Sequence, residues 1–171
     1  MFAMLSQFKI TVGRKIYALI GLGFIGLVGI TILDSRELAS GLNVQKQIEL
    51  RHLTELALGI LKEEHALVQK GGITDADAQK RALARVATLR YGNNDYFWVN
   101  DMHPRMVMHP MRPEMNGNDI STFKDPNGKA LFVDFVNVVK KDGAGFVPYE
   151  WPKPGFDKPQ PKLSYVAGFA P

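Results

Sequence analysis

The sequence predicts an α+β protein in which a transmembrane helix and a long stalk helix precede an antiparallel sheet. Three observations support this. Residues 16–33 form an uncharged apolar run, residues 34–70 contain no proline, and the chain after residue 91 alternates aromatic segments with turn signals. A length of 171 residues suits one folded domain in addition to the membrane segment.

The run from Ile16 to Leu33 (IYALIGLGFIGLVGITIL) is long enough to cross a membrane. As a helix it would extend ~27 Å, close to the ~30 Å hydrocarbon core of a bilayer. A cleaved signal peptide is the alternative, but its apolar region is shorter and ends at small residues. Here the run leads into the charged segment 34–37, so we expect a retained anchor.

Charge predicts the orientation of this anchor. Lys9, Arg14 and Lys15 precede it without any acidic residue, whereas residues 34–171 hold the other 18 basic and all 17 acidic residues. By the positive-inside rule we expect residues 1–15 in the cytoplasm and residues 34–171 outside the inner face. Because the body is nearly neutral, the net charge of +4 does not indicate nucleic-acid binding. The absence of cysteine excludes disulfides and thiolate chemistry.

Two helices should follow the anchor. Residues 34–70 predict a stalk that ends at Gly71-Gly72, and its mixed heptad pattern makes a pure coiled coil doubtful. Thr74 and Asp77 have the spacing of a capping box, which opens a second helix through about Arg90.

The rest of the chain predicts strands with one inserted helix. Asp95–Val99 and Arg105–His109 form a plausible hairpin, and Gly145–Trp151 and Lys162–Phe169 are two further strands. Between these pairs, the apolar spacing of Lys129–Lys141 is helical.

Catalytic and metal-binding patterns are missing from the sequence. The histidines match no common metal spacing, and a faint calcium-loop pattern at 125–128 has Ala130 and Val136 where the loop needs Gly and Glu. No nucleophile motif or phosphate-binding loop occurs. We therefore expect neither enzymatic activity nor a metal or cofactor.

A binding site is better supported, because residues two apart in a strand share a face. The pairs that could line one pocket are Tyr96 with Trp98, Val107 with His109, Tyr149 with Trp151, and Lys162 with Ser164. Their hydroxyl, imidazole, indole and ammonium donors would suit a small carboxylate. The aromatic residues could equally form a core, whereas Lys162 and His109 are harder to bury without a partner.

Several ordered motifs resemble the single Cache, type 2, sensor domain of bacterial methyl-accepting chemotaxis proteins. They are LRYGNNDYFWVND, MVMHP, NGNDI, KDPNGKALF, GFVPYEWPKPG and PKLSYV, within residues 34–171. The resemblance implies a long helix packed on an antiparallel PAS-like sheet in a receptor of the bacterial inner membrane. The sensor domain would be periplasmic or extracellular, with a pocket for acids such as acetate, propionate, pyruvate or lactate.

The family motifs map onto Tyr96, Trp98, His109, Tyr149, Trp151, Lys162 and Tyr165, which we take as the candidate ligand-binding residues. We further expect a homodimer through the stalk helix, no nucleic-acid partner, and signal transfer across the membrane. Family members usually continue into a final strand, a second membrane helix and a signalling region, so we expect this chain to be an N-terminal fragment. The output could instead be a histidine kinase or diguanylate cyclase, or the domain could be a structural or partner-binding ectodomain without a ligand.

Overall fold

The computed structural model describes residues 11–170, and the side chains of these residues except those at 32–36. The chain divides into two units, Met1–Lys46 and Gln47–Pro171, which are described separately. Of the predicted cytoplasmic segment 1–15, residues 1–10 lie outside the described residues.

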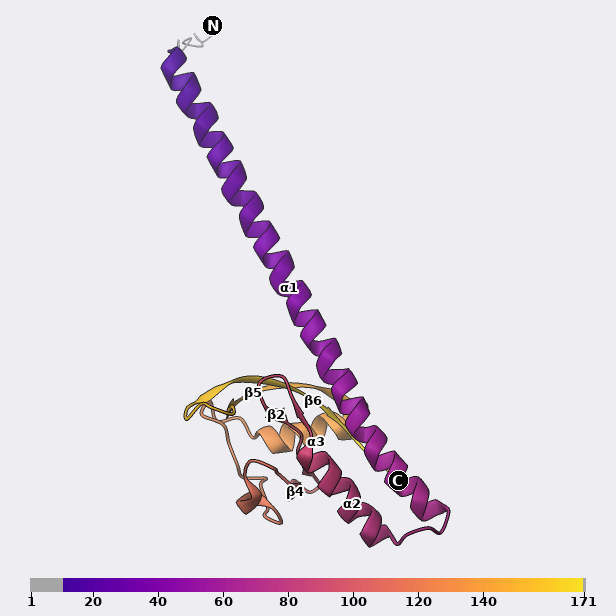
Figure 1. Ribbon diagram of the computed structural model, residues 1–171. Helices are drawn as coiled ribbons and strands as arrows, with labels where there is room; N and C mark the ends of the chain where they lie inside the picture. The colour runs from indigo at the N-terminus through magenta and orange to yellow at the C-terminus, as the bar shows by residue number, and fades with distance from the viewer. Residues whose placement is uncertain (1–10, 171) are drawn as a thin grey trace, which may run out of the picture. The chain divides into compact units, whose positions relative to one another are not determined.

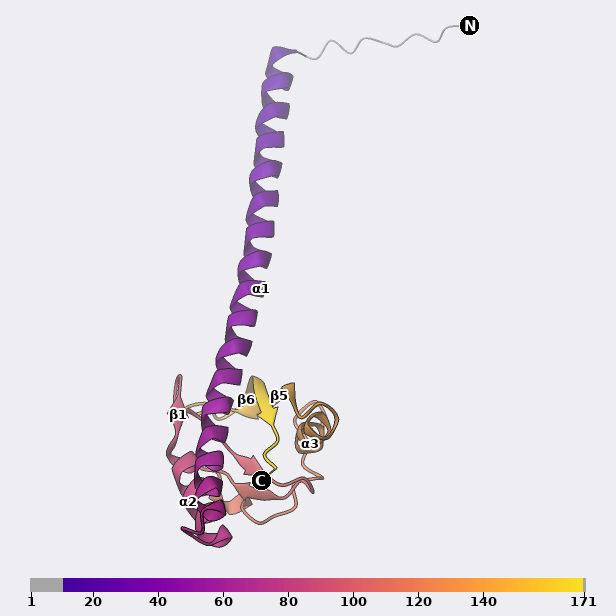
Figure 2. The ribbon, with the colours of Figure 1, turned by 90° about the vertical axis from the view of Figure 1, so that its right-hand side faces the viewer.

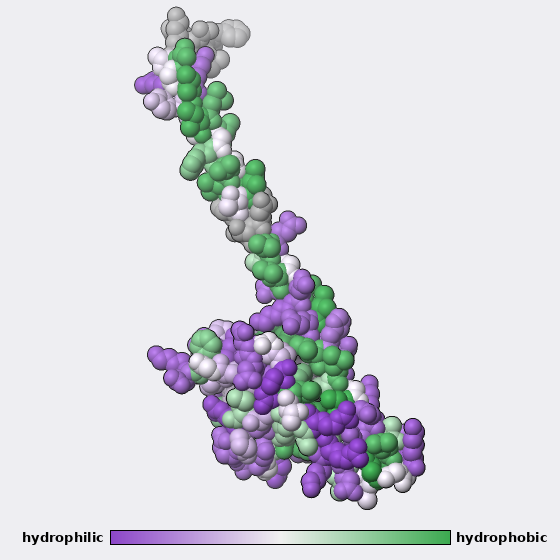
Figure 3. Space-filling view, viewed as in Figure 1, coloured by the Kyte–Doolittle hydropathy of each residue, from purple (hydrophilic) through white to green (hydrophobic). Residues whose placement is uncertain are grey.

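The first unit is the N-terminal part of helix α1 (Val12–Gln69). Within it, Val12–Thr31 is long and apolar enough to cross a membrane, and none of this stretch is buried. Apolar side chains dominate its surface, as the green atoms of Figure 3 show. This stretch shares residues 16–31 with the predicted anchor and also includes Arg14 and Lys15 at its start.

In the second unit, the rest of α1 is followed by α2 (Asp75–Thr88). Helix α1 ends where Gly71 adopts φ +72°, a backbone conformation that suits glycine, and Gly72 donates its N–H to the carbonyl of Leu67. The hydroxyl of Thr74 accepts the N–H of Asp77 at 3.1 Å, so the predicted N-cap is confirmed. Helix α2 ends at Thr88, close to the expected end at Arg90.

A charged cluster joins α1 to α2. Glu64 of α1 is 1% exposed, and its carboxylate forms ion pairs with Arg81 at 3.0 Å and with Arg85 at 2.8 Å. Arg85 also reaches the exposed Glu63 at 2.9 Å. The two arginines supply the positive charge without which a buried carboxylate would be costly.

The strands pair antiparallel in three two-stranded sheets. β1 (Arg90–Tyr91) pairs with β2 (Asp95–Tyr96), β3 (Val99–Asn100) with β4 (Met106–Met108), and β5 (Ala144–Pro152) with β6 (Pro159–Ala167) (Figures 1 and 2). The expected antiparallel α+β architecture is therefore confirmed. The expected strand 95–99 is divided at Phe97–Trp98, because β2 and β3 have different partners and the β3–β4 register shifts between Val99 and Asn100.

Helix α3 (Leu131–Asp142) packs on β5 and β6 and closes the core. It follows a short 3-10 helix, η1 (Pro113–Met115), and ends at Gly143 with φ +76°. Its buried face matches the apolar spacing expected for 129–141. The largest core cluster contains Met106, Met115, Ile120, Leu131, Phe132, Phe135, Val147, Tyr149 and Trp151.

Candidate ligand-binding site

The β5–β6 ladder places four of the predicted pairing residues on one face. Tyr149 lies directly opposite Lys162, and Val147 opposite Ser164. Because directly opposed residues of an antiparallel pair point to the same side, Trp151 and Lys162 share the face that carries Tyr149 and Ser164. The Tyr149 hydroxyl and Ser164 Oγ lie 2.9 Å apart and satisfy each other.

Tyr96 of β2 meets this face through Trp151. The indole Nε1 of Trp151 donates to the Tyr96 hydroxyl at 3.0 Å, and both residues are at least 95% buried. Since the hydroxyl oxygen accepts this bond, its own hydrogen remains available for donation. Burial raises the pKa of Tyr96, although the Trp151 bond and nearby Arg112 oppose the rise, so the hydroxyl keeps its proton at neutral pH.

His109 packs between these two aromatic side chains. Its ring centroid lies 4.9 Å from that of Tyr96 and 6.1 Å from that of Trp151. Burial, followed by the positive charge of Arg112, lowers the pKa of His109 to about 4, so the imidazole is neutral at pH 7. The backbone N–H of Arg112 donates to its Nδ1 at 3.0 Å, which assigns the ring proton to Nε2.

Two cations border the same group. The Arg112 guanidinium lies 4.8 Å from the ring centroid of Trp151, and the Lys162 ammonium lies 4.7 Å from that of Tyr96. Lys162 also lies 3.0 Å from Asp95, whereas none of the ion pairs formed within residues 11–170 includes Arg112. We call the set Tyr96, His109, Arg112, Trp151 and Lys162 the aromatic–cationic cluster.

The cluster has more donors than acceptors. The Tyr96 hydroxyl hydrogen, the His109 Nε2–H and the Arg112 guanidinium have no hydrogen-bond acceptor or carboxylate partner among the described side chains, apart from the Arg112 ring contact. Together with Lys162 they provide neutral and charged donors around a buried aromatic wall. Such a set recognises an oxyanion, and a carboxylate in particular, by charge-assisted hydrogen bonds.

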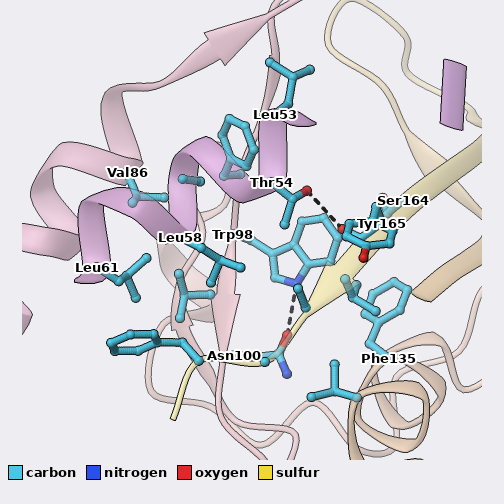
Figure 4. Close-up of a pocket in the computed structure, with 18 of the residues that line it drawn as sticks. Leu53, Thr54, Leu58, Leu61, Val86, Trp98, Asn100, Phe135, Ser164 and Tyr165 are labelled. Atoms are coloured by element: carbon cyan, nitrogen blue, oxygen red, sulfur yellow. Dashed lines mark hydrogen bonds between the residues drawn. The ribbon is translucent and has the colours of Figure 1, made fainter. Parts of the chain in front are cut away.

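An apolar cavity of about 160 Å³ lies beside the cluster. Helix α1, β3, α3 and β6 provide most of its lining. Tyr96 of the cluster also lines the cavity, as does Ser164, which lies on the same face of the ladder as Lys162. Figure 4 shows the Trp98 indole extending across this cavity, with Thr54 of α1 directed toward Tyr165.

Three of the polar side chains around this cavity already have hydrogen-bond partners. Trp98 Nε1 donates to Asn100 at 3.0 Å, Thr54 donates to the carbonyl of Leu50, and Ser164 pairs with Tyr149. A carboxylate would find few free donors there, so the cavity suits apolar atoms and the cluster suits the charged group.

The structure brings four of the seven predicted site residues together: Tyr96, His109, Trp151 and Lys162. Tyr149 lies next to them, but its hydroxyl pairs with Ser164 and its ring packs on Phe135 in the core. Trp98 packs on Phe135 at the cavity. Tyr165 is not brought to the cluster, because it packs against Phe146 on the opposite face of the ladder, near Arg51 of α1.

Sequence reasoning missed Arg112 and Asp95. Arg112 lies in the turn His109-Pro110-Met111-Arg112, and its position three residues after the histidine is the signal that could have found it. Asp95 precedes Tyr96, and neighbours in a regular strand point to opposite faces. Asp95 and Tyr96 nevertheless both contact Lys162, because strand β2 is only two residues long.

Comparison with known proteins identifies the family of the chain. Residues 42–171 match the family model for single Cache domain 2. The chain is 35% identical over 163 residues to the methyl-accepting chemotaxis protein McpP of Pseudomonas putida, covering 95% of this chain and 30% of that protein. It is 30% identical over 121 residues to the sensor histidine kinase MctS of Rhizobium johnstonii, covering 71% of this chain and 25% of that protein.

Solved structures give the same result. A periplasmic sensor domain of a chemotaxis protein superposes with a TM-score of 0.71 at 45% identity, covering 74% of this chain and 88% of that one. A Cache chemosensory domain solved to explain carboxylic acid recognition superposes with a TM-score of 0.73 at 46% identity, covering 76% and 88%.

The fold and these matches define a Cache chemosensory domain of the kind found in chemoreceptors. The chain belongs to the single Cache domain 2 family. It spans about 30% of the length of the chemotaxis protein and about 25% of the length of the histidine kinase that it matches.

Proposed function

We propose that this chain is the ligand-sensing module of a transmembrane chemoreceptor and binds small organic acids of the acetate, propionate, pyruvate and lactate class. The observation that carries the proposal is the convergence of Tyr96, His109, Arg112 and Lys162 donors around a buried aromatic wall. The carboxylate would contact these donors, and its short carbon chain would lie against the aromatic rings.

Ligands of this size limit the affinity. The binding free energy of a small ligand has a ceiling of ~1.5 kcal/mol per heavy atom, so an acid of six heavy atoms binds with at most about −9 kcal/mol. This ceiling corresponds to a Kd of about 0.3 μM, and such moderate binding suits a sensor that must release its ligand as concentrations fall. A coupling free energy of ~1–3 kcal/mol between site and helix would suffice to change the output.

The membrane arrangement is part of the proposal. Residues 1–15 would be cytoplasmic, residues 16–33 would cross the membrane, and the domain from residue 34 would be periplasmic or extracellular. The apolar stretch Val12–Thr31 supports the crossing. Exposed apolar side chains of α1, such as Leu42 and Leu56, support a homodimer through the stalk helix.

The two relatives that share this sensor domain differ in their output. Similarity to a histidine kinase as well as to a chemotaxis protein favours a second candidate, the input domain of a sensor kinase. Both outputs use the same ligand site, so the binding experiments apply to either.

The expected strand after residue 171 stays a prediction. Within the described chain, β6 pairs only with β5 and β3 only with β4, so each keeps a free edge. Both strands also line the apolar cavity. Their free edges offer backbone hydrogen-bonding groups, and the cavity offers apolar side chains, which an added strand requires.

Calorimetric titration of the full chain in detergent micelles with acetate, propionate, pyruvate and lactate tests the proposal. We expect saturable binding by at least one acid, with a rise in thermal midpoint, and no response to propionamide, which lacks the charge. The absence of heat and of thermal shift across the panel would contradict ligand sensing and favour a partner-binding ectodomain.

A further inference from the structure

Lys162 already has an anionic neighbour inside the domain. Its side chain is 9% exposed, and its Nζ lies 3.0 Å from Oδ1 of Asp95. This oxygen is buried and has no hydrogen-bond partner among the described residues, so charge rather than a directed hydrogen bond holds the pair. Attraction without good hydrogen-bond geometry offsets little of the desolvation cost of the nearly buried Lys162 ammonium. The ammonium of Lys162 therefore keeps hydrogen-bond donors for a ligand, although Asp95 balances its charge.

The charges at the site can be counted. Arg112 and Lys162 are positive, Asp95 is negative, and His109 is neutral at pH 7. Glu114 also acts on His109, but it is exposed and its charge is screened by water. The aromatic–cationic cluster together with Asp95 thus carries one uncompensated positive charge, which one carboxylate balances.

We propose that Asp95 makes the site selective for monocarboxylates over dicarboxylates by occupying one of its two cations. The inference rests on the proposed function, since it concerns the same site. A first carboxylate would bind the donors of Tyr96, His109 and Arg112 and accept a hydrogen bond from Lys162, whose charge Asp95 already balances. A second carboxylate on the same ligand would meet Asp95 at Lys162, and repulsion between like charges would oppose it. Neutralising Asp95 frees Lys162 for that second carboxylate.

Butanoate and succinate provide a matched pair of four-carbon ligands for the test. The full chain is titrated in detergent micelles at pH 7 with each acid, as wild type and as Asp95→Asn. Wild type should bind butanoate at least tenfold more tightly than succinate. In Asp95→Asn, succinate affinity should rise at least tenfold and the ratio should shrink accordingly. Glu114→Gln removes a nearby but exposed acid and should leave the ratio within twofold of wild type.

Several results would overturn the inference. Wild-type preference for succinate would do so, as would an unchanged ratio in Asp95→Asn. Loss of butanoate binding in a folded Asp95→Asn would assign Asp95 to positioning Lys162 instead of selecting ligands. Should Asp95→Asn not fold, Asp95→Ser removes the same charge with a smaller side chain. Failure of wild type to bind any small acid would contradict the proposed function itself, and is thereby distinguished from a failure of selectivity alone.

Discussion

The indole Nε1 of Trp151 donates a 3.0 Å hydrogen bond to the hydroxyl of Tyr96, across 55 residues of sequence. This bond joins β5 to β2, two strands that belong to different sheets. It also fixes the direction in which the Tyr96 hydroxyl can donate, because the oxygen is already used as an acceptor. The site therefore depends on the register of both strands.

Loss of that hydroxyl should weaken ligand binding. We expect Tyr96→Phe to lower affinity for the bound acid about tenfold, which corresponds to one hydrogen bond of ~1.5 kcal/mol. Tyr165→Phe serves as the matched control, since Tyr165 packs on the opposite face against Phe146. Titration calorimetry compares the two variants. Equal losses in both would place the ligand away from the Tyr96 hydroxyl.

Loss of the Lys162 ammonium should also weaken ligand binding. Lys162→Met keeps the aliphatic length but removes the charge, and we expect more than a tenfold loss of carboxylate affinity. Lys158→Met, at an exposed lysine before β6, should change affinity by less than twofold. An unchanged affinity in Lys162→Met would remove Lys162 from the site.

Stability should fall as the pH falls from about 6.5 to 4, partly because of His109. In the folded state the pKa of this imidazole is lowered to about 4, so over this range the unfolded chain binds the proton and the folded chain does not. We expect a His109 contribution of about 2 kcal/mol, allowing for solvent screening. Urea unfolding at pH 7 and pH 4.5 should show a smaller loss in His109→Gln than in wild type.

His103 provides the control for this experiment. It is exposed, so His103→Gln should keep the wild-type pH dependence. If His109→Gln and wild type lose equal stability between the two pH values, the buried neutral imidazole is not the cause.

Close packing at Gly145 should make this position intolerant of a side chain. A Cβ there would lie 2.6 Å from Cγ1 of Val138 in α3. We expect Gly145→Ala to lower the free energy of unfolding by about 1–3 kcal/mol. Gly59→Ala, in an open part of α1, should instead raise it by about 0.5–1 kcal/mol. Chemical denaturation of both variants measures the contrast, and destabilisation by Gly59→Ala would contradict it.

Removing the negative charge of Glu64 should destabilise the domain less than removing the positive charges of Arg81 and Arg85. Glu64→Gln leaves two partly exposed arginines that water can solvate, so we expect a loss of only about 1–2 kcal/mol. Replacing Arg81 and Arg85 together by Gln leaves the buried carboxylate without a countercharge, and the thermal midpoint should fall further than in Glu64→Gln. The reverse order would show that Glu64 is solvated in the folded state.

The sequence predicted the elements better than the site. The helix cap at Thr74 and the glycine stop at Gly71 are local signals, and each marks a helix end in the structure. The alternation of β5 and β6 likewise predicted which side chains share a face. These features depend on a few neighbouring residues, which is why sequence reasoning reached them.

Features that depend on strand partners were out of reach. The division of 95–99 between β2 and β3 follows from a change of pairing partner that composition does not encode. Tyr165 was included among the candidate site residues because of a family motif. It lies three residues from Lys162 in β6 and therefore on the other face of the strand. Arg112 joins the cluster through a turn after His109, and no periodicity describes a turn.

Strand β6 contacts two different parts of the domain. Lys162 on one side contacts Tyr96, while three residues along the strand the backbone carbonyl of Tyr165 lies 3.4 Å from the Thr54 hydroxyl of α1. At ~3.3 Å per residue, about 10 Å of extended chain separates the two contacts. An extended segment this short cannot stretch, so any displacement of β6 at Lys162 would also displace the carbonyl that contacts α1. The strand would thus couple the position of the Lys162 ammonium to that of helix α1.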